Sequence, residues 1–207
     1  YEKLEFNSLL DRFEIQEDIL EEDINIKKLE EEEEIQNLIN DIKSKSEIAM
    51  DIILKDYHNP VTCEMKQIVI ALDSEGIYAI NKNNLKAEEF RVVFTDEEIK
   101  KNVLHAKETM IYLKRQGIKL KGLQFDPLLA AYLLKPSDSL PTPAELLSRE
   151  LNLLLEEDMS EINRAGILTQ KLFALKPILV DKLEKNDLLK LFQEVELPLL
   201  KVLVEME

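Results

Sequence analysis

The sequence predicts an α/β fold, a mixed β-sheet with helices packed against it. Hydrophobic residues occupy 45% of the 207 positions, and with only 4 Gly and 7 Pro the chain can bury a substantial core. Short β-branched runs dominate residues 46–80, whereas apolar residues at helical spacing dominate from residue 123 onward. Strands first and several helices afterwards is the order typical of a sheet covered by helices.

The N-terminal part, residues 1–45, is predicted to precede the compact domain. Residues 1–13 form a short amphipathic stretch, and residues 14–34 form an acidic run of the kind that usually serves as a solvated linker. A helix is expected over 31–43, because apolar residues recur there at helical spacing. These residues are Ile35, Leu38, Ile39 and Ile42. The compact domain is then expected to begin near Ser46.

Three strands are expected next, over 46–57, 65–73 and 76–80. The last two form a hairpin that turns at Asp73–Gly76. Residues 90–94 fit either a further strand or part of a helix.

Thr95 and Glu98 have the spacing of a capping box, which predicts a helix start at Thr95. Within that segment, residues 102–106 (NVLHA) fit a short buried strand before a helix from about 107 to 116, which Gly117 ends.

The remaining chain is predicted to be helical. Asp126 at an N-cap and Pro127 at the first helical position begin one helix, since each residue type is favoured at that place. Further helices are expected over 142–152, 160–184 and 187–206.

The charge balance argues against a nucleic-acid-binding protein of the usual kind. The net charge is −15, from 42 acidic and 27 basic residues, and binding to DNA gains most of its affinity from Lys and Arg on phosphates. The basic stretch 113–122 is interpreted as a helix end followed by a turn, where cations favour the helix dipole. Contact with DNA is therefore expected only through a larger parent protein.

The single Cys63 excludes an internal disulfide and fits a reducing compartment. No apolar run reaches the length of about 18 to 20 residues that spans a bilayer, and no signal peptide is visible. We therefore expect a cytoplasmic protein with no membrane partner.

Three stretches, in this order, resemble bacterial DNA polymerase I of family A. YEKLEFNSLLDRF resembles the end of its 5′ nuclease domain, FDPLLAAYLL a helix of its 3′–5′ exonuclease-like domain, and EVELPLLKVLVEME the join to the polymerase domain. The resemblance implies an RNase H-like fold, which agrees with the sheet and helices expected above. It also implies that the chain is cut from a longer DNA-directed DNA polymerase.

The resemblance divides the chain into three parts and names its partners. Residues 1–45 would lead from the 5′ nuclease side, residues 46–193 would form the exonuclease-like domain, and residues 194–207 would begin the junction helix. The expected partners are the 5′ nuclease and polymerase domains of the parent chain. The apolar face of the last helix could also join two isolated chains into a dimer.

Proofreading exonucleases of this family use two divalent metal ions, which need converging carboxylates. On the first strand, a D-x-E pair aims both carboxylates at one place, because residues i and i+2 share a face. Here Asp51 is paired with Ile53 in one register and with Ala49 in the other. Thr109 and Arg164 stand where the resemblance places the other aspartates.

The catalytic site is therefore interpreted as lost, with no catalytic residue, metal or cofactor, and the fragment is not expected to be an enzyme. If the motif assignment holds, the side chains of Asp51, Thr109 and Arg164 meet at one pocket. Asp51 itself is interpreted as a residue at a strand end or sheet edge.

Other candidates for chemistry are weaker. His58 and His105 lie 47 positions apart without a cluster of further ligands, so each is interpreted as a turn or packing residue rather than a zinc ligand. Cys63 lacks a nearby His or basic setting, which is typical of an unreactive thiol. Asp126 is interpreted as a helix cap and not a ligand.

The leading hypothesis is a non-catalytic exonuclease-like domain that acts as a structural spacer for a DNA polymerase in replication and repair. The first alternative is an active two-metal 3′–5′ exonuclease on single-stranded DNA, with its carboxylates in another register. The second alternative is a stand-alone protein–protein interaction domain with the same arrangement of sheet and helices.

Overall fold

The computed structural model describes residues 18–20, 24–57, 59, 62–73, 76–82, 88–136 and 139–207. The amphipathic stretch expected over 1–13 and the interpretation of His58 lie outside these residues.

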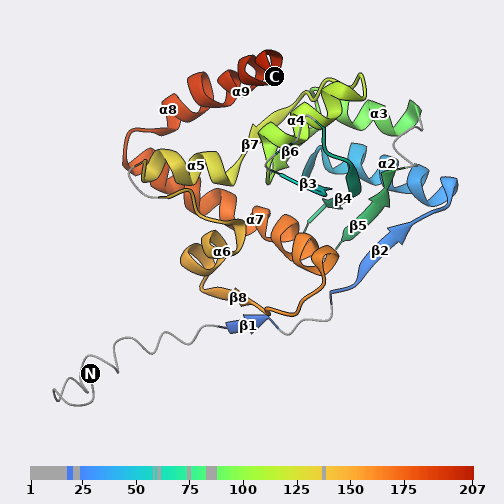
Figure 1. The fold of residues 1–207 in the computed structure, drawn as a ribbon, viewed down its shortest axis with the longest axis horizontal. Helices are drawn as coiled ribbons and strands as arrows, with labels where there is room; N and C mark the ends of the chain where they lie inside the picture. The colour runs from blue at the N-terminus through green and yellow to red at the C-terminus, as the bar shows by residue number, and fades with distance from the viewer. Residues whose placement is uncertain are drawn as a thin grey trace.

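The core of the fold is a six-stranded mixed sheet with the strand order β2-β5-β4-β3-β6-β7 (Figure 1). Strands β3–β4 and β4–β5 pair antiparallel, whereas β2–β5, β3–β6 and β6–β7 pair parallel. The strands are β2 (Ile26–Leu29), β3 (Glu47–Leu54), β4 (Met65–Ala71), β5 (Ile77–Asn81), β6 (Lys100–Val103) and β7 (Leu123–Phe125). A separate two-stranded sheet joins β1 (Asp18–Leu20) to β8 (Leu153–Leu155). The α/β fold with a mixed sheet is confirmed.

Helices cover both faces of this sheet. Helix α7 packs against β3 and β4, while α2 and α4 pack against β3 and contribute to a second buried cluster (Figure 1). The helices are α2 (Glu32–Lys45), α3 (Glu88–Thr95), α4 (Ala106–Arg115), α5 (Pro127–Leu134), α6 (Pro143–Leu151), α7 (Glu161–Lys185), α8 (Leu189–Leu191) and α9 (Leu197–Met206). A π-helical segment, η3 (Phe192–Glu196), joins α8 to α9.

Strand β3 alternates between the two buried clusters. Ile48, Met50 and Ile52 lie in the cluster that includes α2 and α4, whereas Ala49 and Ile53 lie in the cluster that includes α7. Because successive strand residues point to opposite faces, Asp51 shares the α7 face with Ala49 and Ile53. This face positions the candidate site.

Several expected elements are confirmed. Strands β4 and β5 form the antiparallel hairpin, Gly76 N donates to Asp73 Oδ1 at its turn, and α6 begins at a full capping box between Thr142 and Glu145. Asp126 is the N-cap of α5, with Pro127 in its first turn.

Four expectations are wrong. Thr95 does not begin a helix but ends α3, which also settles residues 90–94 as helical. The acidic run contains β2, which pairs with β5, so the packed structure begins well before Ser46. Helix α2 also belongs to it, because its apolar face lies in the buried core. Asp51 is neither at a strand end nor at an edge, because β3 is a central strand and Asp51 lies within it.

The C-terminal helices are only half covered. Leu197, Leu200 and Val204 of α9 are buried, whereas Leu199 and Val202 are 40% and 54% exposed. Among the described residues, no helix combines the length and hydropathy that crossing a membrane requires.

Candidate functional site, at Asp51 and His105

The site centres on a buried carboxylate. Asp51 is 2% exposed, and its Oδ1 lies 3.0 Å from Nδ1 of His105. The pairing follows from topology: β6 lies parallel to β3, and Leu104 N donates to Met50 O just beyond the end of β6. His105, which follows Leu104, therefore lies next to the side chain of Asp51, which follows Met50.

His105 is held from two sides. Its ring lies against Tyr57, with ring centroids 4.5 Å apart, and the Tyr57 hydroxyl donates to the Ile52 carbonyl at 3.0 Å. Burial alone disfavours the imidazolium, but the charge and hydrogen bond of Asp51 raise the pKa of His105 above its ordinary value. Burial, and then the Asp51 charge, raise the pKa of Tyr57, so its phenol stays neutral.

A pocket of about 400 Å³ opens beside this pair and is lined by residues that include Asp51, Ile53, His105, Glu161 and Arg164. Arg164 projects from the first turns of α7, and its Nη2 donates to the Glu156 carbonyl at 2.7 Å. The Glu161 carboxylate forms an ion pair with Lys66 at 2.6 Å. The pocket thus holds a guanidinium and an acid that is already paired.

The structure brings together only part of the expected set. Asp51, Ile53 and Arg164 line one pocket, and Ala49 is buried on the same face of β3. Thr109 does not line it: it lies one helical turn after His105 on α4 and is 1% exposed. Its Oγ1 has no hydrogen-bond partner among the residues that the structure describes. His105 takes the place at the pocket that was expected for Thr109.

His105 was expected to be a turn or packing residue, and its ring does pack on Tyr57, but its pairing with Asp51 was not expected. The sequence placed His105 near the end of a short expected strand. Its contact with Asp51 arises because β6 lies beside β3 and parallel to it. The sequence alone does not give the order of the strands in the sheet.

Asp126 caps α5 as expected and has a second role. Its Oδ1 accepts from Leu128 N and Leu129 N, while its Oδ2 accepts from Ala106 N at 3.1 Å. Burial raises the pKa of Asp126 to about 7. The three N–H donors stabilise the carboxylate and lower this pKa, but their effect is smaller than that of burial. Asp126 therefore ties the start of α4 to the start of α5 beside His105.

The residues present do not fit a pair of divalent cations. Magnesium and manganese need several converging oxygen ligands, and a guanidinium cannot supply one. Asp51 is bound to His105, and its neighbours on the pocket wall include Ile53 and Arg164. In the described part of the chain, no group of three or more His, Cys, Asp or Glu side chains is placed to hold a metal ion.

Comparison with known proteins assigns the chain to a family. Residues 48–158 match the family model described as "DNA polymerase I, ribonuclease H-like domain". DNA polymerase I of Bacillus subtilis is 31% identical over 229 residues, which cover 100% of this chain and 25% of that protein. DNA polymerase I of Geobacillus stearothermophilus is 26% identical and covers 80% of this chain and 20% of that protein. The chain thus spans about a quarter or less of these relatives.

Solved structures show the same fold. The POL domain of Pol1 from M. smegmatis superposes with a TM-score of 0.74 at 24% identity, over 88% of this chain and 31% of that one. RNase D of Escherichia coli superposes with a TM-score of 0.73 at 14% identity, over 87% of this chain and 51% of that one. With β3 at the centre of a mixed sheet and helices on both faces, the chain belongs to the ribonuclease H-like, 3′–5′ exonuclease-like domain family of DNA polymerase I.

Proposed function

We propose that this domain does not hydrolyse DNA and acts as a folded spacer within a DNA polymerase I. The observation that carries the proposal is the Asp51 pocket. Its central carboxylate is bound to an imidazole, and Ile53 and Arg164, which stand at expected carboxylate positions in one register of the motif assignment, line the same pocket. A cation entering this pocket would meet two carboxylates that already have partners, Asp51 bound to His105 and Glu161 paired with Lys66. It would also meet the positive charge of Arg164.

The contacts of Arg164 support a loss of catalytic activity at this pocket rather than a different catalytic reaction. Its guanidinium donates to the Glu156 carbonyl and so ties the first turn of α7 to the segment that follows β8. An arginine in that role contributes to the fold, and its charge opposes a divalent cation. The site residues thus serve packing and local hydrogen bonding.

The spacer role rests on the family and on one helix face. The relatives are whole DNA polymerase I proteins, of which this chain spans about a quarter or less. Helix α9 and the segment before it expose Val195, Leu199, Val202, Leu203 and Met206. We propose that this face contacts the polymerase domain of the parent protein, that residues 194–207 belong to the junction, and that the chain before β2 leads from the 5′ nuclease side.

The test is degradation of a 5′-labelled single-stranded oligonucleotide by the purified chain, with excess Mg²⁺ or Mn²⁺. We expect no shortening from the 3′ end beyond that of an Asp51→Ala variant, which controls for contaminating nuclease. Metal-dependent shortening by the unaltered chain that Asp51→Ala abolishes would establish the alternative, an active 3′–5′ exonuclease.

A further inference from the structure

The C-terminal helical run contains one widened turn. From Leu189 to Met206 the chain passes through α8, the π-helical segment η3 and α9 without a loop. The N–H of Leu197 donates to the Phe192 carbonyl, five residues back, and Pro198 follows in the first turn of α9. Proline has no N–H to donate, and its ring crowds the carbonyl four residues back, so a regular helix is disfavoured here. Helices bend at π turns and at prolines.

The chain at the start of this turn is anchored in the core. Phe192 is 1% exposed, and the centroid of its ring lies 5.6 Å from that of Phe125, at the end of β7. Phe192 N also donates to the Leu188 carbonyl at 2.9 Å, and η3 packs against α5. A bend at η3 therefore has a fixed base on its N-terminal side.

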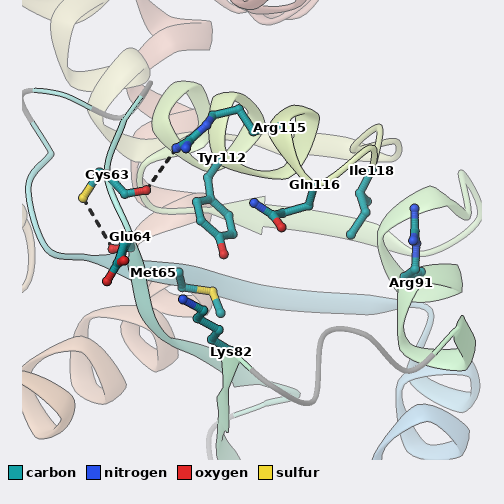
Figure 2. Close-up of a pocket in the computed structure, with 9 residues that line it drawn as sticks. All are labelled: Cys63, Glu64, Met65, Lys82, Arg91, Tyr112, Arg115, Gln116 and Ile118. Atoms are coloured by element: carbon teal, nitrogen blue, oxygen red, sulfur yellow. Dashed lines mark hydrogen bonds between the residues drawn. The ribbon is translucent and has the colours of Figure 1, made fainter.

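The helix on which α9 rests is fixed as well. Helix α9 packs against α4, and at the C-terminal end of α4 Arg115 Nη1 donates to the Cys63 carbonyl at 3.0 Å, a bond drawn in Figure 2. Tyr112 of the same helix is 5% exposed. Just beyond the helix, the Gly117 carbonyl accepts from Arg91 Nη2 at 3.1 Å. These contacts hold α4 to the rest of the domain through residues other than those that reach α9.

Two lysines of α4 hold α9 at the surface. Lys107 Nζ lies 2.6 Å from Glu207 Oε1. Lys114 Nζ donates to the Val204 carbonyl at 2.6 Å and lies 3.6 Å from Glu205 Oε2. Each of the four charged side chains is at least 35% exposed, and exposed ion pairs contribute little to stability. The charged contacts of α9 can therefore open at small cost.

The packing beneath α9 is incomplete. A groove of about 460 Å³ lies between α9 and α4 with the segment that follows it, and its lining includes Met110 of α4 and Val202 of α9. Protein interiors leave few voids larger than a water molecule, so this contact is looser than a core. A segment that buries few apolar side chains opens more easily than the core. The buried side chains of α9 are Leu197, Leu200 and Val204.

We infer that α9 is a hinged arm, which pivots at Phe192–Glu196 and opens from α4 as a unit, and that Lys107 and Lys114 hold it closed. Opening exposes the groove and the buried face of α9. The consequence for a partner rests on the proposed function, in which this helix belongs to the junction with the polymerase domain. A domain that contacts the arm would move with it, while the chain before η3 stays in place.

The test is thiol labelling of single-cysteine variants of the 207-residue chain. Cys63→Ser is the background, because serine also offers an acceptor to the backbone N–H that the Cys63 sulfur accepts. Leu197→Cys, Leu200→Cys and Val204→Cys report opening along the arm. Leu183→Cys reports the core, because Leu183 is fully buried on α7. Each rate is divided by that of the same variant in concentrated urea. We expect the three arm sites to label within about threefold of one another and at least about tenfold faster than Leu183→Cys.

The role of the lysines is tested in the Val204→Cys variant. Lys114→Gln should speed its labelling by about two- to fivefold, the effect of losing one exposed ion pair. Lys185→Gln is the matched control, because Lys185 pairs with Asp181 on α7, and it should leave the rate unchanged. Thermal melting confirms that each variant is folded before rates are compared.

Three results would overturn the inference. Labelling that falls by more than about tenfold from Val204→Cys to Leu197→Cys would mean that the helix unravels from its end without a pivot. Labelling of all three arm sites at the rate of Leu183→Cys would mean that α9 is part of the core. Equal effects of Lys114→Gln and Lys185→Gln would mean that Lys114 does not hold the arm. None of these rates depends on nuclease activity, so a failure here is distinct from a failure of the proposed function.

Discussion

The buried carboxylate of Asp51 on β3 pairs with the half-buried imidazole of His105, which follows the neighbouring parallel strand β6, with 3.0 Å between Oδ1 and Nδ1. The pair sits where the family resemblance implies converging carboxylates. His105 gives the buried Asp51 carboxylate a hydrogen-bond partner, which offsets the cost of burying the acid.

The first prediction concerns the pH dependence of this pair. Asp51 raises the pKa of His105, so the charged pair contributes fully below the unfolded histidine pKa of about 6.5 and is lost as pH rises through the folded pKa. Asp51→Asn should lower the pKa of His105 and cost about 1 to 3 kcal/mol, more at about pH 6 than at about pH 9. Urea unfolding at both pH values, with NMR titration of the imidazole, measures both effects.

An Asp51→Asn, His105→Gln double variant supplies the control. Its loss of stability should be less than the sum of the two single losses, because the residues act as a pair. A cost of Asp51→Asn that is the same at both pH values would contradict a charged pair.

The second prediction separates charge from hydrogen bonding at Asp126. Asparagine can keep the bonds from Leu128 N and Leu129 N through its carbonyl oxygen. Its NH₂ group would then face the N–H of Ala106, so that two donors meet. Asp126→Asn should therefore cost about 1 to 3 kcal/mol, since a buried donor loses its acceptor. Chemical unfolding followed by circular dichroism measures the loss.

The pH dependence at Asp126 has its own window. Its pKa is raised to about 7, so the contribution of the protonated carboxyl is complete below the unfolded pKa of about 3.9 and is lost as pH rises through about 7. Asp126→Asn should flatten the decline of stability between these values. An unchanged slope in that range would show that Asp126 stays ionised in the folded protein.

The sequence alone predicted more of the fold than of the candidate site. Local signals sufficed for the β4–β5 hairpin and the capped helices α5 and α6, because turn and cap chemistry is written in adjacent residues. Strand β2 was missed because its short IKKL run lies in an acidic segment and becomes a strand by pairing with β5. Tertiary pairing decided that element over local composition.

The site was half predictable for the same reason. Asp51 and Ile53 share a strand face by simple alternation, so their meeting at the pocket follows from the strand itself. Thr109 was placed by counting along a motif, yet one helical turn separates it from His105, which reaches the pocket. The approach of β6 to β3 could not be obtained from spacing.

The third prediction uses two glycines with the same backbone conformation. Gly122 and Gly117 both have φ of +70°. A Cβ on Gly122 would lie 2.3 Å from the Ile99 carbonyl oxygen, whereas on Gly117 its nearest contact would be Arg91 Nη2 at 3.8 Å. Gly117→Ala should cost about 1 to 2 kcal/mol, the strain of the left-handed conformation. Gly122→Ala should cost about 3 kcal/mol or more, because the backbone must also move.

Thermal and urea unfolding of both variants measure the difference. Equal losses would mean that the backbone segments at Ile99 and Gly122 move apart at little cost. That result would conflict with the bond from Lys101 N to the Gly122 carbonyl at 2.8 Å, which ties the two segments together.

The last prediction tests the reason given for the proposed loss of catalysis. Asp51 and Glu161 already line the pocket, so Ile53→Glu combined with Arg164→Asp would raise the carboxylates around the cavity from two to four and remove the arginine's charge. Hard divalent cations gain affinity with the number of charged oxygen ligands. Mn²⁺ titration followed by electron paramagnetic resonance should show binding about tenfold or more tighter than in the unaltered chain. The matched variant Ile53→Gln with Arg164→Asn keeps the shapes without the charges and should stay near the unaltered chain. Mn²⁺ binding by the unaltered chain as tight as by the carboxylate variant would mean that other oxygens already form a metal site, and the proposed loss of catalysis would fail with it.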